Sequence, residues 1–158
     1  MNQRESISFP GATARVQHIR DGAVIWEGET HNVVTTAGRD FIHTQAYATS
    51  GIGANGLNYI GLSADALTET TASTTLSTEL SGSGLTRAQG VVSHTSGTNT
   101  TTVAKTFTMS GAGPQTVQKA ALFTASSSGT MCHVLAFSAS RSLVLNDQLV
   151  VTFTITLG

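Results

Sequence analysis

The residues of this chain that could do chemistry are few, and most of them lie in its first third. His18, Glu29, His31, Asp40 and His43 carry the imidazole and carboxylate groups that bind metals or move protons. No pair of them has the spacing of a known metal motif such as His-Glu-x-x-His, so we expect no metal and no cofactor. Asp40 and His43 are three residues apart on an expected helix, where a local surface pair is the simpler explanation.

Two other patterns resemble reactive sites and fail on geometry. Cys132 and His133 are adjacent on an expected strand, whose successive side chains point to opposite faces, so thiol and imidazole cannot meet. Cys132 is better explained as a small core residue. The glycines of residues 51–56 lack the preceding strand and following helix of a dinucleotide loop. The sequence therefore predicts a protein that is not an enzyme.

Charged residues make up only 11% of the 158 residues, where about 25% is typical of soluble domains. Eight Lys and Arg stand against nine Asp and Glu, so the formal net charge is −1. This balance argues against nucleic acid as a partner, because each neutralised phosphate needs a basic side chain. We find neither a secretory signal nor an apolar run that could cross a membrane. The low charge favours self-association, so we expect a homo-oligomer.

The elements that must position these residues begin with a hairpin. Residues 13–20 and 23–30 read as strands joined by Asp21-Gly22, a strong signal for a type I′ turn. Alternation places Trp26 on one face of the second strand with Val24 and Gly28. Thr35 or Thr36 can cap a short helix that runs to Ala46.

Strands dominate the rest of the chain. A short buried strand is expected at 57–62, followed by a Thr- and Ser-rich connection at 64–83. Strands then recur roughly every ten residues, and in the last one Leu149, Val151, Phe153, Ile155 and Leu157 point inward. We predict a mainly β fold, an antiparallel β-sandwich (jelly-roll-like) with one short helix and an N-terminal β-hairpin. Its single domain, 1–158, divides into a hairpin arm (1–35), the helix (36–46) and the main strands (57–158).

Several short blocks, taken in order, resemble small β-rich virion proteins of tailed bacteriophages: residues 32–42, 58–63, 76–80, 117–123 and 145–153. The chain departs from that pattern in its long connection at 64–75, and the resemblance does not cover the hairpin with Trp26. The resemblance implies a structural protein of the virion, made in the bacterial host cytoplasm. Its partners would be other virion proteins, either the major capsid protein or tail proteins.

Among such roles we expect capsid decoration or cement, in which many weak contacts on a lattice add up to strong attachment. The alternatives are a tail, baseplate or fibre-adaptor protein, or a carbohydrate-binding module. The residues expected to contact a partner are in the charged hairpin: Arg15, Arg20, Trp26, Glu27 and Glu29. An equally simple explanation is that these charges only solvate an exposed hairpin.

Overall fold

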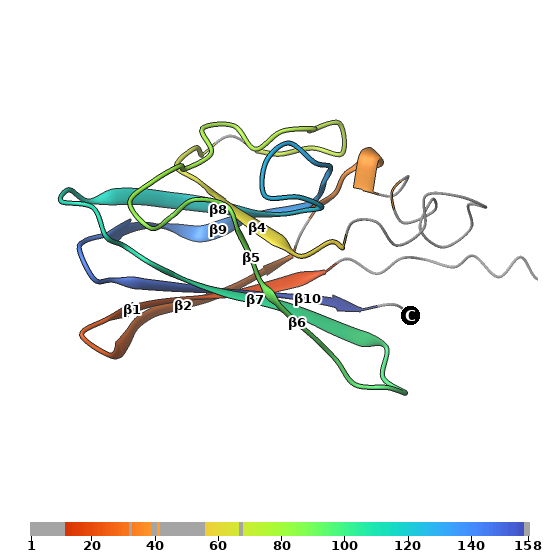
Figure 1. Cartoon of the computed structure of the whole chain (residues 1–158), viewed down its shortest axis with the longest axis horizontal. Helices are drawn as coiled ribbons and strands as arrows, with labels where there is room; N and C mark the ends of the chain where they lie inside the picture. The colour runs from red at the N-terminus through yellow and green to blue at the C-terminus, as the bar shows by residue number, and fades with distance from the viewer. Residues whose placement is uncertain (1–11, 32, 39–40, 42–55, 67, 157–158) are drawn as a thin grey trace, which may run out of the picture.

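The computed structural model describes residues 12–31, 33–38, 41, 56–66 and 68–156. This part of the chain forms two five-stranded antiparallel sheets, which Figure 1 shows as two stacked layers. The strand order of sheet A is β2 (Ala23–His31), β1 (Thr13–Arg20), β10 (Gln148–Thr156), β7 (Thr100–Thr108), β6 (Val91–His94). That of sheet B is β3 (Val33–Val34), β9 (Met131–Leu143), β8 (Gln115–Phe123), β4 (Tyr59–Ser63), β5 (Ala88–Gln89). The predicted mainly β, antiparallel fold is confirmed.

The core lies between the two sheets and is built from alternate residues of the strands. On β10, Leu149, Val151 and Phe153 are completely buried, whereas Thr152 between them is only partly covered. Full burial of one such side chain contributes about 1.5–3 kcal/mol, so the alternation fixes which face of the strand turns inward. The predicted faces of this strand are confirmed, except that Leu157 lies outside the described residues.

Strands β1 and β2 form the predicted hairpin. Asp21 and Gly22 have φ values of 49° and 78°, which are the left-handed conformations that a type I′ turn requires at both central positions. On its other side β1 pairs with β10, from Thr13 opposite Thr154 to Ile19 opposite Gln148. The hairpin is therefore an integral part of sheet A.

The expected grouping of Val24 with Trp26 is wrong because β2 contains a register shift. Trp26 lies opposite His18, but Val24 lies opposite Ile19, so β2 has one extra residue at this point. From Trp26 onward, the predicted grouping of Trp26 with Gly28 is confirmed. Trp26 and Gly28 share the inner face, since a Cβ on Gly28 would lie 2.6 Å from the Trp26 ring.

The helix begins where the sequence predicts. Thr35 is its N-cap, because the Gly38 N–H donates to the Thr35 hydroxyl at 2.9 Å. Residues 36–38 and 41 are helical, and the predicted continuation to Ala46 lies outside the described residues. Gly38 is explained by packing, since a Cβ there would lie 2.6 Å from the carbonyl oxygen of Cys132 on β9.

Within the described residues, no helix has the length and hydrophobicity needed to span a bilayer.

The Thr- and Ser-rich connection at 64–83 folds back onto the sandwich. The Leu80 N–H donates to the Leu62 carbonyl, and the Ser63 hydroxyl donates to the Ser77 carbonyl at 2.6 Å. Leu76 is buried in a second apolar cluster with Phe123 of sheet B. The described part of this connection contains no strand and is held against the sandwich by hydrogen bonds and by the buried Leu76, among other contacts.

Candidate functional site

Three of the five residues expected to contact a partner lie together on the outer face of sheet A, on β1 and β2. The Arg15 guanidinium is 2.6 Å from Glu27, and the Gln17 amide donates to the same carboxylate oxygen at 2.7 Å. The hydrogen bond from Arg15, then that from Gln17, lowers the pKa of Glu27, and Glu27 raises the pKa of Arg15. Glu29 and Arg15 line a shallow depression of about 250 Å³. Such an exposed ion pair contributes little to folding.

The strand register aligns the side chains of this outer face in rows that cross sheet A. One row contains His31, Thr13, Thr154, Thr102 and Ser93; the next contains Glu29, Arg15, Thr152, Ala104 and Val91. On this outer face, Lys, Arg, Asp and Glu occur only on β1 and β2, and the outward positions of β10, β7 and β6 carry hydroxyl, amide and methyl groups. Covering such a surface with protein does not require desolvation of charges.

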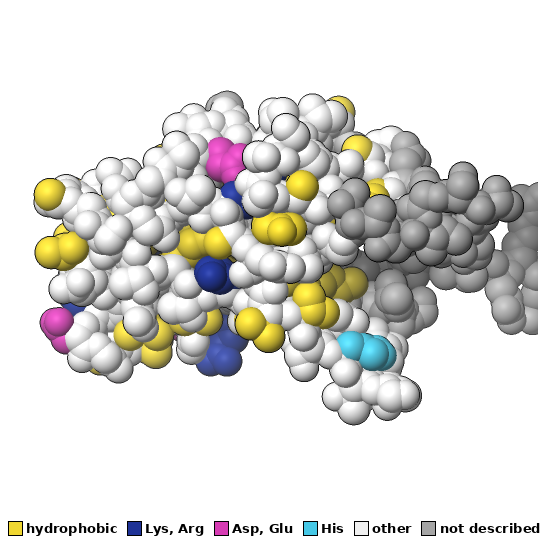
Figure 2. All heavy atoms as spheres, viewed as in Figure 1, with side chains coloured by type: hydrophobic (Ala, Val, Ile, Leu, Met, Phe, Trp, Pro, Cys, Tyr) yellow, Lys and Arg dark blue, Asp and Glu magenta, His cyan; other side chains and the backbone are white. Residues whose placement is uncertain are grey.

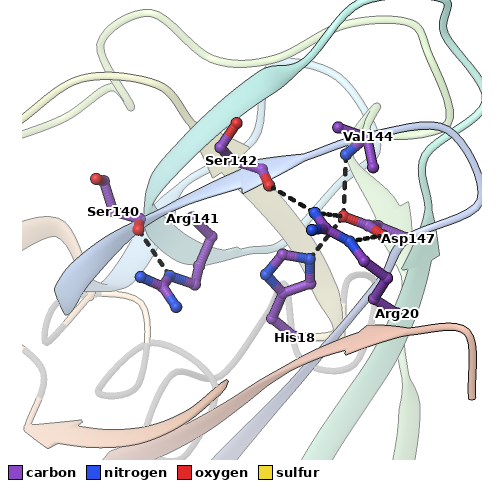
Figure 3. A network of polar contacts seen from close by, with 7 residues as sticks. All are labelled: His18, Arg20, Ser140, Arg141, Ser142, Val144 and Asp147. Atoms are coloured by element: carbon purple, nitrogen blue, oxygen red, sulfur yellow. Dashed lines mark hydrogen bonds and ion pairs between the residues drawn. The ribbon is translucent and has the colours of Figure 1, made fainter. Parts of the chain in front are cut away.

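Arg20, the fourth residue, is held by a buried carboxylate (Figure 3). Its Nε and Nη2 atoms lie 2.9 and 2.7 Å from the two oxygens of Asp147, which is 1% exposed. The Nε2 atom of His18 is 2.7 Å from the Asp147 carboxylate, and the Val144 N–H donates to the same carboxylate at 3.0 Å. The hydrogen bond from Arg20 is the main cause that holds the pKa of Asp147 well below its usual range. The network ties β1 to the turn that precedes β10, which gives Arg20 a structural role.

Trp26, the fifth residue, faces the core side of sheet A and is partly buried. Its ring centroid is 6.3 Å from that of Phe137 on β9. The Arg141 guanidinium lies 4.4 Å from the centroid of the Trp26 ring, which is a cation–π distance. Trp26 thus packs β2 against β9. That any of the five residues contacts a partner remains a prediction.

The candidate metal ligands that the structure describes are not gathered into a cluster. His18 contacts Asp147, and His31 lies at the end of β2, one of the two edge strands of sheet A. Across the part of the chain that the structure describes, no group of three or more His, Cys, Asp or Glu could hold a metal ion. Asp40 and His43 lie outside that part.

Cys132 and His133 are both buried in β9, with 0% and 3% of their surface exposed. Burial raises the pKa of Cys132 to about 12 and lowers the pKa of His133 to about 4. At neutral pH this combination gives a protonated thiol, which is a poor nucleophile. The interpretation of Cys132 as a core residue is confirmed.

Sequence reasoning missed two ionic clusters that fasten the loops to sheet B. The Lys119 ammonium has no exposed surface and lies 2.7 Å from Glu69 and 3.7 Å from Asp65. Arg87 forms a double hydrogen bond with Glu79, and its guanidinium lies 3.4 Å from the ring centroid of Phe123. In the sequence, the first cluster could have been found from Lys119, a single lysine within the apolar run 117–123. A charge buried in such a run implies a carboxylate partner.

The described residues therefore offer an exposed face with few charges, which is a candidate interaction surface. The view in Figure 2 shows few charged side chains among a largely uncharged surface. Of the described residues, buried Asp147 and Lys119 are each engaged in salt bridges that hold strands and loops together. On the outer face of sheet A, the described side chains offer hydroxyls, methyl groups and the Arg15–Glu27 ion pair, which suits binding to protein.

Comparison with known proteins agrees with this conclusion. The model of the family described as podophage GP4 fiber I protein gp80 matches residues 57–156, from just before β4 to the end of β10. Searches of curated proteins and of solved structures found no match. The family match covers more than half of the chain and omits β1, β2 and β3. It supports the predicted resemblance to virion proteins, and the chain belongs to the family of the podophage GP4 fiber I protein gp80, a family of small phage virion structural proteins.

Proposed function

We propose that this protein is a non-enzymatic subunit of the tail-fibre apparatus of its phage, bound to other virion proteins. The observation that carries the proposal is the fibre family match over residues 57–156. It favours the tail or fibre alternative over capsid decoration, the role expected from the sequence. The uncharged outward positions of β10, β7 and β6 support a role in protein binding.

The proposed contact with the neighbouring virion protein is the charged corner of sheet A, formed by Arg15, Glu27 and Glu29. These side chains share one exposed face and line or border one depression. The remaining outer face adds hydroxyl and methyl groups, so a partner can bury a neutral centre beside a charged rim. The subunit would be made in the host cytoplasm and incorporated during virion assembly.

The position in the particle can be tested by counting and locating copies. Quantitative mass spectrometry of purified virions would give the ratio to the major capsid protein, and immunogold labelling would give the location. We expect a few to a few dozen copies per particle, with label at the tail. A near-stoichiometric ratio with label over the head would instead establish a decoration protein. Absence from the particle would contradict a virion role and make glycan-array screening the next step.

The contact can be tested by charge reversal with an internal control. Arg15→Glu places like charges beside Glu27, whereas Arg15→Glu combined with Glu27→Arg restores an ion pair with opposite polarity. If the corner contacts a partner, both variants are lost from virions while the double variant keeps the wild-type unfolding free energy. Normal incorporation of the double variant would show that these charges only solvate the hairpin.

A further inference from the structure

The four sheet edges of the described residues differ in how well they are protected from pairing with another strand. On sheet B, the edge strands β3 and β5 have two residues each. On sheet A, the edge strand β2 carries Glu27 and Glu29 and contains a register shift. Short length, charge and bulges are the devices that normally prevent edge-to-edge association. The fourth edge, β6, is short, with four residues, but it carries no Lys, Arg, Asp or Glu and its pairing with β7 has no register shift.

Strand β6 has four residues, Val-Val-Ser-His, all of them exposed. Val91 is 74% exposed, the highest value among the exposed large hydrophobic residues described, and Val92 is 50% exposed. Only β7 pairs with β6 in the described structure, from Val91 opposite Ala104 to His94 opposite Thr101. In Figure 1 the β6–β7 hairpin projects beyond the body of the sandwich, so its outer edge is accessible. An edge strand with two exposed valines and no Lys, Arg, Asp or Glu is a template for a further strand.

We propose that β6 is a self-association edge, at which the β6 strand of a second copy of this chain adds in antiparallel orientation. The proposal concerns the contact between subunits and rests on the structural role proposed above. A second copy is favoured because β6 carries no Lys, Arg, Asp or Glu, so two identical strands do not repel each other. The same pairing at β2 would bring Glu27 and Glu29 close to their copies.

The alternation of β6 restricts the register to those in which the axis passes through a residue, and we place it on Val92 so that the two valines meet. Val92 lies opposite the buried Val103 and faces the core side, whereas Val91 and Ser93 face outward with Ala104 and Thr102. A two-fold axis perpendicular to the sheet keeps each residue on its own face, so paired residues must differ by an even number. Centring the axis on Val92 places Val92 opposite Val92 of the second copy and Val91 opposite Ser93. The product is a continuous ten-stranded sheet.

This contact is small. Four residues from each strand bury much less than the roughly 800 Å² per partner of a stable complex, so the dimer in solution should be weak. In a virion, neighbouring contacts would raise the effective concentration of the second copy and make the pairing persistent. The test must therefore trap a short-lived dimer.

Disulfide trapping in the purified full chain provides that test. The native Cys132 is completely buried, so in Val92→Cys the new thiol is the one available for reaction. The proposed register brings the two introduced thiols directly opposite each other across the interface, within disulfide range. In the matched control Val91→Cys, the two Cα atoms would be about 8 Å apart, beyond the limit of about 7 Å. We expect Val92→Cys to form a covalent dimer at least about tenfold faster than Val91→Cys.

Equal or slower crosslinking of Val92→Cys would overturn the proposal. Sedimentation equilibrium gives a second measurement: the wild type should show association that increases with concentration, and Val92→Lys should abolish it. If the wild type remains monomeric and Val92→Cys crosslinks in virions to a different protein, β6 accepts a strand from another virion protein and the second-copy proposal is wrong. These outcomes are independent of copy number and location in the particle, which test the proposed function.

Discussion

The Nζ atom of Lys119 lies 2.7 Å from Oε1 of Glu69, and no part of the lysine side chain is exposed. This contact joins the middle of β8 to the long connection that follows β4. Burial of an ammonium is costly unless an acidic partner lies close to it, and here Asp65 lies 3.7 Å away as a second carboxylate. A charge that is unusual in an apolar strand thus determines where the connection at 64–83 lies.

Replacing Lys119 with Met is therefore expected to lower the free energy of unfolding by about 3–5 kcal/mol, because Glu69 loses its buried counter-charge. Urea denaturation monitored by Trp26 fluorescence would measure the change. Lys105→Met, at a partly exposed lysine of β7, serves as the control and should change stability by less than about 1 kcal/mol. Adding Glu69→Gln to Lys119→Met should recover part of the loss; no recovery would contradict the assigned pairing.

Asp147→Asn should destabilise the fold by about 2–4 kcal/mol, since the buried carboxylate accepts hydrogen bonds from Arg20 and from the Val144 backbone. The expected loss is below the upper limit for buried pairs because Arg20 is 40% exposed and partly screened by solvent. Asp21→Asn is the matched control, since Asn also accepts the left-handed turn conformation at this exposed position. Equal stability of the two variants would argue against a structural role for the network.

Two glycines with similar backbone conformations should respond differently to alanine. Gly84 and Gly97 have φ values of 78° and 84°, but a Cβ on Gly84 would collide with the carbonyl oxygen of Thr108, whereas a Cβ on Gly97 meets open space. Gly97→Ala should cost about 1–2 kcal/mol from backbone strain alone. Gly84→Ala should cost at least about 2 kcal/mol more, or prevent folding, because backbone must move. Thermal unfolding of the two variants measures both losses of stability. Equal losses would contradict the close approach of Gly84 to the Thr108 carbonyl oxygen.

The buried His133 should make the fold sensitive to mild acid. Its folded-state pKa of about 4 lies below the ordinary value of 6.5, so between these pH values the unfolded chain binds a proton that the folded chain does not. The free energy of unfolding should then fall by about 1.4 kcal/mol per pH unit, or about 3 kcal/mol from pH 6.5 to 4, and be unaffected by His133 above pH 7.

The measurement compares urea denaturation at pH 7 and pH 5 for the wild type and for His133→Gln, with the exposed His94→Gln as the control. The pH dependence should be much smaller in His133→Gln and unchanged in His94→Gln. The depressed pKa of Asp147 contributes in a separate window, because its stabilisation is complete above about pH 4 and is lost as the pH falls further. A wild-type stability that is flat from pH 7 to 5 would be inconsistent with a buried neutral His133.

By itself, the sequence determined the elements whose signals are local. Asp21-Gly22 specified the type I′ turn, Thr35 the helix cap, and the alternation around Leu149, Val151 and Phe153 the inner face of the last strand. These features depend on backbone sterics, a hydrogen bond within three residues, and the two-residue period of a strand. The scarcity of charge likewise indicated a protein that binds other proteins.

Only the tertiary structure decided which distant residues meet. Arg20 and Asp147 are 127 residues apart, and Lys119 and Glu69 are 50 apart, so no local pattern could pair them. The register shift of β2 and the exposure of β6 depend on the order of strands within sheet A, which short alternating segments do not specify. For this reason the sequence could name the charged hairpin as a candidate contact, but only the fold separated Arg15, Glu27 and Glu29, which face outward, from Arg20 and Trp26, which hold the sandwich together.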